Sequence, residues 1–346
     1  MDVVDVVAVV GSCVPERSRY AKELAAETGR ALVPARVLAG AGAAAAVRRA
    51  LEAGKRGPGV VAELPMETDV LELIGESADA RSGMRLVGVV CVADASHLLD
   101  DLARTDDVSV ASEHGRGVLA HALLAVRQIE YASTVVLVNW VPLPTPALST
   151  VMALVSHLGP RARLRLDRAQ AGPLPPGEPY EARQDRAGWL CVLNGEFAPH
   201  MTDPRVGAFR YEHVRPLHPG RLHRTLVERV GEGEFGTVVR SAGFCRLATR
   251  PRVVAQWEHV GRTICLDPLA ADAELDVDEE LLALGQELAV IGLDLDAAGL
   301  TAALDGAALT DAELAAGPVS WAGFADPFPA WRAIPGGSAW RDGRTL

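Results

Sequence analysis

The amino-acid sequence predicts an α/β protein in which a mostly parallel sheet, with helices on both faces, is followed by a smaller α+β domain. Over residues 1–160, short apolar stretches alternate with alanine-rich stretches of helical length. Strands and helices that take turns in this way are typical of a parallel sheet covered on both sides. After residue 205, apolar and polar residues alternate between glycines, which indicates antiparallel strands.

The first part of the chain supplies the parallel sheet. An apolar run at residues 3–10 opens into Gly11, and a helical segment follows at residues 16–28. Further strands are predicted at residues 31–37, 59–64, 86–92 and 135–139, and further helices at residues 43–53, 68–74, 118–131 and 147–157. Because ligands of such sheets bind at the carboxyl ends of the strands, we expect functional residues there.

A stretch without apolar periodicity divides the chain. Residues 172–188 are rich in proline, glycine and charged side chains, which is typical of a linker. We therefore predict a first domain at residues 1–170, a linker at residues 171–205 and a second domain at residues 206–335.

The second domain combines strands with helices. A strand is predicted to reach Tyr211, with a turn at residues 218–220 and a helix at residues 221–230 whose apolar side chains recur with a helical period. Residues 236–247 alternate like a strand. Residues 278–295 have an apolar period of three to four, which indicates an amphipathic helix.

Composition limits the possible functions. The formal net charge of −11 argues against non-specific nucleic-acid binding, although a local arginine patch can exist on an acidic chain. The N-terminus is acidic where a secretion signal needs positive charge, and no apolar run approaches the ~20 residues that span a bilayer, so we expect a cytoplasmic protein without membrane contact. Five scattered cysteines without CxxC spacing are interpreted as reduced core thiols rather than metal ligands.

The most specific sequence pattern lies between Tyr211 and Pro251. It combines RP-x-HP-x-RL with VVRS-x-GF-x-x-LATRP, followed by Trp257, and a later stretch at residues 308–331 carries LTD-x-E and DPFP-x-W. Both patterns resemble the C-terminal part of CobW-like proteins, which are P-loop GTPases associated with insertion or trafficking of zinc and cobalt. A weaker similarity covers the first domain. The resemblance implies a P-loop-NTPase-like first domain and a divergent member of actinobacterial type.

The resemblance places the phosphate-binding loop at residues 11–18, GSCVPERS. Such a loop needs glycine N–H groups near the phosphates, a lysine to neutralise them and Ser or Thr to hold magnesium. Gly11 and Ser18 match this pattern, whereas Glu16 replaces the second glycine and Arg17 replaces the lysine. The motif is therefore degenerate.

Two further observations argue against phosphate binding by this loop. Pro15 removes a backbone donor, and the neighbouring carboxylate repels phosphate. The chain contains only two lysines, Lys22 and Lys55, and neither completes a Walker A motif.

The later nucleotide elements retain single residues of each motif. Glu63 ends a strand as in the family, without the glycine that should follow, and Asp94 ends the next matching strand. Asn139 begins NWVP where the guanine motif NKxD is expected, so the guanine-binding aspartate is missing. The tentative nucleotide-binding residues are Gly11, Arg17, Ser18, Glu63, Asp94 and Asn139, and no catalytic residue is predicted.

Metal ligands are similarly scarce. Family members that carry metal have a CxCC or CxxC thiolate cluster, and the corresponding residues 38–46 contain no cysteine. His218 and His223, five residues apart, are weak zinc candidates, and a structural role for His218 is favoured. Three isolated carboxylates are expected to be solvated or to cap helices: Asp278, Asp294 and Asp296.

The retained architecture and the lost motifs favour one hypothesis. The chain is interpreted as a CobW-like pseudo-GTPase that acts as a binding or adaptor protein in zinc homeostasis or the zinc-limitation response, without a certain cofactor. A protein partner is expected. Resemblance to actinobacterial CobW-like proteins linked to the zinc-starved ribosome makes a ribosomal partner one candidate.

Two alternatives stay open. The first is an active metallochaperone that binds GTP with magnesium through Arg17, Glu63 and Asp94, and hydrolyses it to deliver zinc or cobalt. The second, compatible with the adaptor hypothesis, is protein binding through aromatic residues of the second domain, although core positions are favoured for them. These aromatic residues are Trp257, Trp321, Phe328 and Trp331.

Overall fold

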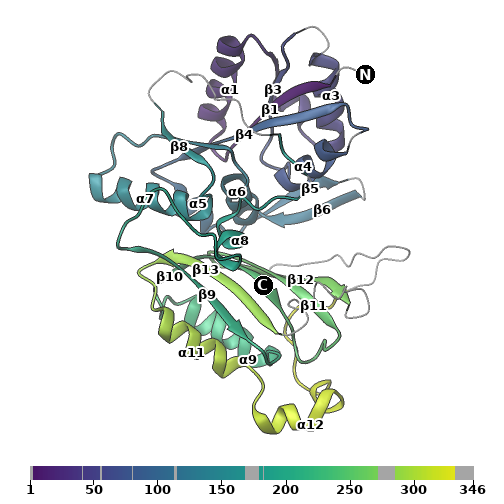
Figure 1. Ribbon diagram of the computed structural model, residues 1–346, viewed down its shortest axis with the longest axis vertical. Helices are drawn as coiled ribbons and strands as arrows, with labels where there is room; N and C mark the ends of the chain where they lie inside the picture. Colours follow the sequence, from purple (N-terminus) through teal and green to yellow (C-terminus); the bar gives the residue numbers. More distant parts are fainter. Residues whose placement is uncertain are drawn as a thin grey trace. The chain divides into compact units, whose positions relative to one another are not determined.

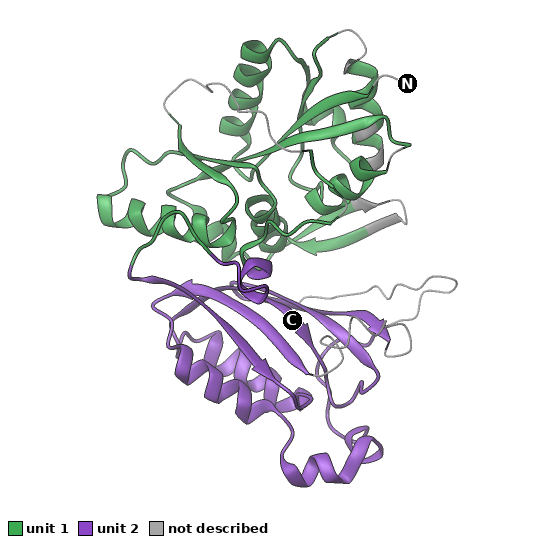
Figure 2. Ribbon diagram, viewed as in Figure 1, with its two compact units in different colours: residues 1–188, 198–203 green, residues 189–197, 204–346 purple. Residues whose placement is uncertain are grey.

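The computed structural model describes residues 3–40, 42–54, 57–79, 81–112, 115–167, 179–181, 183–271 and 285–331. The chain forms two compact units (Figure 2). The first contains Met1–Gly188 with Ala198–Asp203, and the second contains Trp189–Phe197 with Pro204–Leu346. A short helix, α8 (Gly188–Leu193), lies within the stretch predicted as a linker. Among the described residues, no helix has the length and apolar character needed to cross a membrane.

The first unit is built on a six-stranded sheet in the order β2-β3-β1-β4-β7-β8 (Figure 1). Every neighbouring pair of strands is parallel, which confirms the predicted α/β class. The strands are β1 (Val4–Val10), β2 (Ala31–Val33), β3 (Val60–Glu63), β4 (Met84–Asp94), β7 (Thr134–Val138) and β8 (Arg163–Leu166).

Helices and one hairpin connect these strands. The helices are α1 (Val14–Thr28), α2 (Ala35–Leu38), α3 (Ala43–Gly54), α4 (Val70–Ala78), α5 (Leu98–Leu102), α6 (His121–Glu130) and α7 (Thr145–Leu158). The hairpin joins β5 (Asp107–Ser112) to β6 (Gly115–Ala120). The helix predicted at residues 118–131 therefore begins three residues later, because its first residues belong to β6.

The central strand β1 is buried on both faces. Val7 and Val9 pack with Leu24 of α1 in one apolar cluster. Ala8 and Val10, which point to the opposite face, are fully buried as well. A strand that loses solvent on both sides must be almost entirely apolar, which explains the hydrophobic run at residues 6–10.

The second unit contains a five-stranded antiparallel sheet in the order β12-β11-β10-β13-β9. Its strands are β9 (Val206–His213), β10 (Thr237–Cys245), β11 (Val253–Val260), β12 (Thr263–Ala271) and β13 (Gln286–Leu293). Its helical segments are α9 (Pro219–Arg224), the π-helical η1 (Thr225–Val230), α11 (Ala297–Ala307) and α12 (Asp311–Trp321). Leu226 and Leu300 bring η1 and α11 into a common core with Trp257 of the sheet.

The amphipathic helix predicted at residues 278–295 is wrong where the structure describes it. Residues 286–293 form β13, which pairs with β9 on one side and β10 on the other. From Leu288 to Leu293 every residue of this strand is buried, so apolar residues occupy both faces and the two-residue alternation of a strand disappears. Residues 278–284, including Asp278, lie outside the described residues.

Candidate functional site

The turn after β1 depends on a glycine. Gly11 has a φ of +142°, and a Cβ at this position would lie 2.1 Å from the carbonyl oxygen of Val92 in β4. A larger residue would separate these two central strands, so glycine is required by the close approach of the backbones. The match of Gly11 to a phosphate-binding motif thus has a structural explanation.

The connection between β1 and α1 is too short to wrap around a phosphate. Helix α1 begins at Val14, so Gly11, Ser12 and Cys13 alone link the strand to the helix, and the backbone N–H of Arg17 already donates to the carbonyl of Cys13 at 2.9 Å. The last five of the eight residues aligned with the loop are therefore helical. Glu16 places a negative charge in the first helical turn, where the helix dipole favours it.

Four of the predicted site residues form one buried cluster. The Nη1 of Arg17 donates to the Gly11 carbonyl at 2.6 Å, and its Nε lies 3.3 Å from Oε1 of Glu63. The same carboxylate oxygen accepts a hydrogen bond from the Ser18 hydroxyl at 2.5 Å. Its second oxygen accepts from the backbone N–H of Ala35 at 3.1 Å. The side chains of Arg17 and Glu63 are 3% and 5% exposed.

These contacts keep Glu63 ionised. Burial is the largest single influence and raises the pKa of Glu63. The hydrogen bonds from Ser18 and Ala35, followed by the charge of Arg17, outweigh burial and lower its pKa below the ordinary value. The cluster is therefore an internal ion pair, in which the protein's own carboxylate neutralises the cation.

Asp94 and Asn139 form a second polar group at the ends of β4 and β7. One oxygen of Asp94 accepts from the backbone N–H of Ser96 at 2.9 Å and from its hydroxyl at 2.6 Å, and the other accepts from Asn139 at 2.6 Å. Burial is the largest influence and raises the pKa of Asp94. The hydrogen bonds together outweigh burial, so the pKa lies below its ordinary value. Asn139 has a φ of +53° and also lies 3.3 Å from a carboxylate oxygen of Glu16.

This arrangement does not fit magnesium and a nucleoside triphosphate. Arg17 is turned inward and bonded to protein acceptors, and the Ser18 hydroxyl donates to Glu63 instead of facing a metal ion. Glu16 faces Asn139 at the mouth of the site, where it would repel phosphate. In the expected guanine motif, the indole of Trp140 donates to the backbone carbonyl of Asp167 at 2.9 Å, and the position of the missing aspartate is Pro142.

The histidine candidates occupy structural positions. The Nδ1 of His218 accepts from the Arg221 backbone N–H at the start of α9, and its ring stacks on Phe324 with centroids 4.4 Å apart. Burial, followed by the charge of Arg221, lowers the pKa of His218. The ring of His223 meets Phe328 edge to face at 6.0 Å. Within the described part of the chain, no three His, Cys, Asp or Glu side chains form a group that could hold a metal ion.

Two of the three carboxylates expected to be solvated or to cap helices lie just after β13. Asp296 caps α11 by accepting from the backbone N–H of Gly299 at 2.9 Å. Asp294 pairs with Arg205 at 2.9 Å on the surface. Neither carboxylate contributes to a binding site.

The two sequence patterns of the second domain contact each other. Arg221, from the first pattern, forms two hydrogen bonds to the carboxylate of Glu313, from the second, at 2.8 and 2.7 Å. Arg250 pairs with Asp326 at 3.0 Å and lies over the ring of Trp331 at 4.2 Å. The specific sequence signature therefore describes how two distant segments pack.

The aromatic residues proposed as an alternative binding surface are core residues. Trp257, Trp321 and Phe328 are between 2% and 7% exposed, and Trp331 packs against the core with its indole bonded to the Leu266 carbonyl at 2.7 Å. Three of the four are thus buried, and Trp331 is partly exposed.

A buried polar chain in the second unit was not predicted from the sequence. The indole of Trp257 donates to the Ser241 hydroxyl at 2.8 Å, and this hydroxyl lies 3.2 Å from Nδ1 of His259. Burial, together with the charge of Arg240, lowers the pKa of His259 to about 4. Ser241 and His259 are paired residues on the neighbouring strands β10 and β11. Finding this contact from the sequence would have required knowing the register in which the two strands pair.

Comparisons with known proteins agree with the resemblance of the second domain. Residues 206–308 match the family described as "Cobalamin synthesis protein cobW C-terminal domain". A Dictyostelium discoideum protein named "Zinc-regulated GTPase metalloprotein activator 1" is 24% identical over 298 residues, which cover 78% of this chain and 62% of that protein. The chain thus matches less than two thirds of the length of this relative.

Two solved structures were also found, the Zn(II)-bound YjiA GTPase from E. coli and a Zn(II)-bound triple mutant of it. They have TM-scores of 0.34 and 0.35 at 12% and 11% identity, and each match covers 89% of this chain and 100% of the other. Residues 206–308 are therefore identified as a CobW C-terminal domain, and the match to the curated relative extends the similarity to 78% of the chain.

Proposed function

We propose that this chain is a CobW-like pseudo-GTPase, which acts as a binding or adaptor protein in zinc homeostasis or the zinc-limitation response without hydrolysing GTP. The proposal rests mainly on the buried Arg17–Glu63 pair, which fills the place where a GTPase of this fold neutralises phosphate. The Glu63 carboxylate neutralises Arg17, as a phosphate group of a nucleotide would in an active GTPase. No nucleotide is needed to complete this site.

Energetics favour this proposal over an active GTPase. If Arg17 turned outward to meet a phosphate, Glu63 would lose its buried cationic partner. Removing one partner of a buried ion pair costs about 3–5 kcal/mol. Nucleotide affinity would fall by a factor of roughly 10² to 10³ or more, before the repulsion from Glu16 is included.

The link to zinc comes from the family and from the name of the curated relative. In the proposed role the chain contacts a protein partner in the cytoplasm, and a ribosomal protein or ribosome-associated factor is one candidate. In this proposal zinc is the cargo that active family members deliver, and it is not a resident cofactor of this chain.

Calorimetric titration of the metal-free protein with GTP and with ATP, each with magnesium, tests the proposal. We expect no saturable heat at millimolar nucleotide, whereas a relative with an intact GxxxxGK[ST] loop serves as the positive control. Saturable, magnesium-dependent GTP binding that Arg17→Ala weakens would contradict the proposal and restore the GTP-hydrolysing metallochaperone. Hydrolysis of GTP would then be the next measurement.

A further inference from the structure

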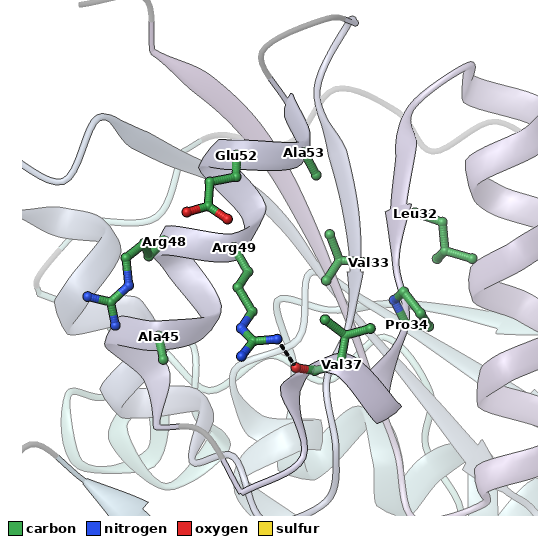
Figure 3. Close-up of a pocket in the computed structure, with 9 residues that line it drawn as sticks. All are labelled: Leu32, Val33, Pro34, Val37, Ala45, Arg48, Arg49, Glu52 and Ala53. Carbon is green, nitrogen blue, oxygen red and sulfur yellow. Dashed lines mark hydrogen bonds between the residues drawn. The ribbon is translucent and has the colours of Figure 1, made fainter.

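An open groove lies on the first unit, and neither Arg17 nor Glu63 lines it (Figure 3). It has a volume of about 670 Å³ and runs between the β2–α2 segment on one side and α3 on the other. The residues that line it are Leu32, Val33, Pro34, Val37, Ala45, Arg48, Arg49, Glu52 and Ala53. Because β2 is an edge strand of the sheet, one side of the groove opens to solvent.

The floor of the groove is aliphatic. Leu32 and Val33 come from β2, Val37 from α2, and Ala45 and Ala53 from α3. Val37 is 40% exposed, so its side chain is open to solvent at the groove. These side chains can take aliphatic groups of a ligand.

The rim of the groove is basic. Arg48 is exposed, and no ion pair joins it to any residue that the structure describes. Arg49 extends from α3 across the groove and donates to the Val37 carbonyl at 2.5 Å, as the dashed line in Figure 3 shows. This bond fixes α2 to α3, so Arg49 sets the width of the groove while Arg48 is available to a ligand.

The charge around the groove contrasts with the rest of the chain. The charged residues that line the groove are Arg48, Arg49 and Glu52. The described residues 30–40 and 42–54 contain four basic side chains and one acidic one, Glu52, although the chain as a whole has a formal net charge of −11. The segment next to the β2 edge of the sheet therefore has a net positive charge on an acidic protein. Such segregation favours an anionic ligand and increases its association rate.

The geometry points to a docking site for an extended acidic peptide segment of a protein partner, with carboxylate and aliphatic side chains in alternation. The aliphatic side chains would enter the groove and the carboxylates would meet Arg48. This inference deepens the proposed adaptor function, because it names the chemistry of the partner. RNA fits less well, since residues 30–56 contain no aromatic side chain on which bases could stack.

Fluorescence anisotropy of the full chain tests the site with a fluorescein-labelled peptide of alternating glutamate and leucine. We expect saturable binding at micromolar concentrations that weakens as salt increases. Arg48→Glu should reduce the affinity by about tenfold or more, because it replaces attraction by repulsion. Val37→Asp, a second exposed position, should weaken binding as well.

The matched control is Arg163→Glu, which changes an exposed arginine on β8 at the opposite edge of the same sheet. It should leave the affinity unchanged within about twofold, since screening limits distant charge effects. Equal losses for Arg163→Glu and Arg48→Glu would overturn the site, as would equal binding of a lysine–leucine peptide. Absence of binding, or tighter competing binding of polyuridine RNA, would also overturn it.

The outcome is separable from that of the nucleotide titration. If the peptide fails to bind while GTP and ATP also give no heat, the groove assignment falls and the pseudo-GTPase proposal stands. If GTP binds and the acidic peptide also binds with the expected variant pattern, the groove assignment stands and the pseudo-GTPase proposal falls.

Discussion

At the scale of single residues, Arg17 and Glu63 are coupled more strongly than surface ion pairs of the same unit. Arg17→Ala should destabilise the protein by about 3–5 kcal/mol, because Glu63 stays buried without its cation. Arg17→Met combined with Glu63→Leu should recover much of this loss, since neither charge is then buried. Urea unfolding of Arg17→Met, Glu63→Leu and the double variant gives the coupling free energy.

Arg19→Ala is the control for this cycle. Arg19 lies on the same helix and pairs with Glu23 and Asp167, but its side chain is 38% exposed. Its loss should cost less than about 1 kcal/mol. If the double variant is as unstable as the sum of the two single ones, Arg17 and Glu63 are not energetically coupled.

Because the pKa of His259 is lowered in the folded state, we expect the free energy of unfolding to fall in acid. Its pKa of about 4 in the folded state lies below the unfolded value of 6.5, so folding requires the neutral ring. The contribution is complete above about pH 6.5 and is lost as the pH falls through 4, and it amounts to about 3 kcal/mol at most. Urea unfolding between pH 7.5 and 4.5 should show this slope.

His259→Gln removes the titrating ring and isolates its effect from other groups, including His157, whose pKa is also lowered by burial. The stability difference between wild type and this variant should shrink as the pH falls. A difference that stays constant over the range would show that His259 does not titrate as the structure indicates.

At the scale of elements, the junction of β1, β4 and α1 depends on Gly11. A Cβ there would meet the Val92 carbonyl at 2.1 Å with φ at +142°, so Gly11→Ala should cost more than about 3 kcal/mol or leave the protein insoluble. Gly75→Ala is the matched control, because this glycine lies within α4 and nothing lies within 4 Å of its added Cβ. It should stabilise by about 0.5–1 kcal/mol. Thermal unfolding of both variants distinguishes a steric requirement from a general intolerance of alanine.

The element scale also shows why sequence patterns predicted some strands and missed others. The run that became β1 is apolar at every position except Asp5 and is bounded by Gly11, so its assignment as a strand was clear. The same property in β13 imitated a helical period, because a strand buried on both faces has no polar side to mark its alternation. Its place in the sheet comes from pairing with β9 and β10, which lie far away in sequence.

The site follows the same logic. Glu63 and Arg17 could be placed at strand and helix ends from the sequence, because motif positions identify them. Their mutual contact could not be predicted, because the two residues are 46 positions apart in the sequence and meet only since β1 and β3 are neighbours in the sheet. The early start of α1 was hidden as well, because Pro15 can begin a helix or interrupt a loop.

At the scale of the whole molecule, ligand linkage distinguishes the two main hypotheses. A nucleotide that binds the folded state stabilises it by RT ln(1 + L/Kd), where L is the nucleotide concentration, so the melting temperature rises with the ratio of L to Kd. We expect millimolar GTP with magnesium to shift the melting temperature of this chain by less than about 1 °C. A relative with an intact phosphate loop should shift by several degrees under the same conditions, and a similar shift here would contradict the pseudo-GTPase proposal.

The Glu63 carboxylate has a further consequence, because it holds both Ser18 of α1 and the first residue of α2. In GTPases, segments of this kind are ordered by the γ-phosphate and released on hydrolysis, so the nucleotide acts as a clock. The Glu63 carboxylate is part of the chain and cannot be released by hydrolysis. Under the proposed function, no timed release of these segments takes place. Under the proposed function, the cell then sets the strength of the response by making or degrading the protein, and dosage replaces turnover as the controlling variable.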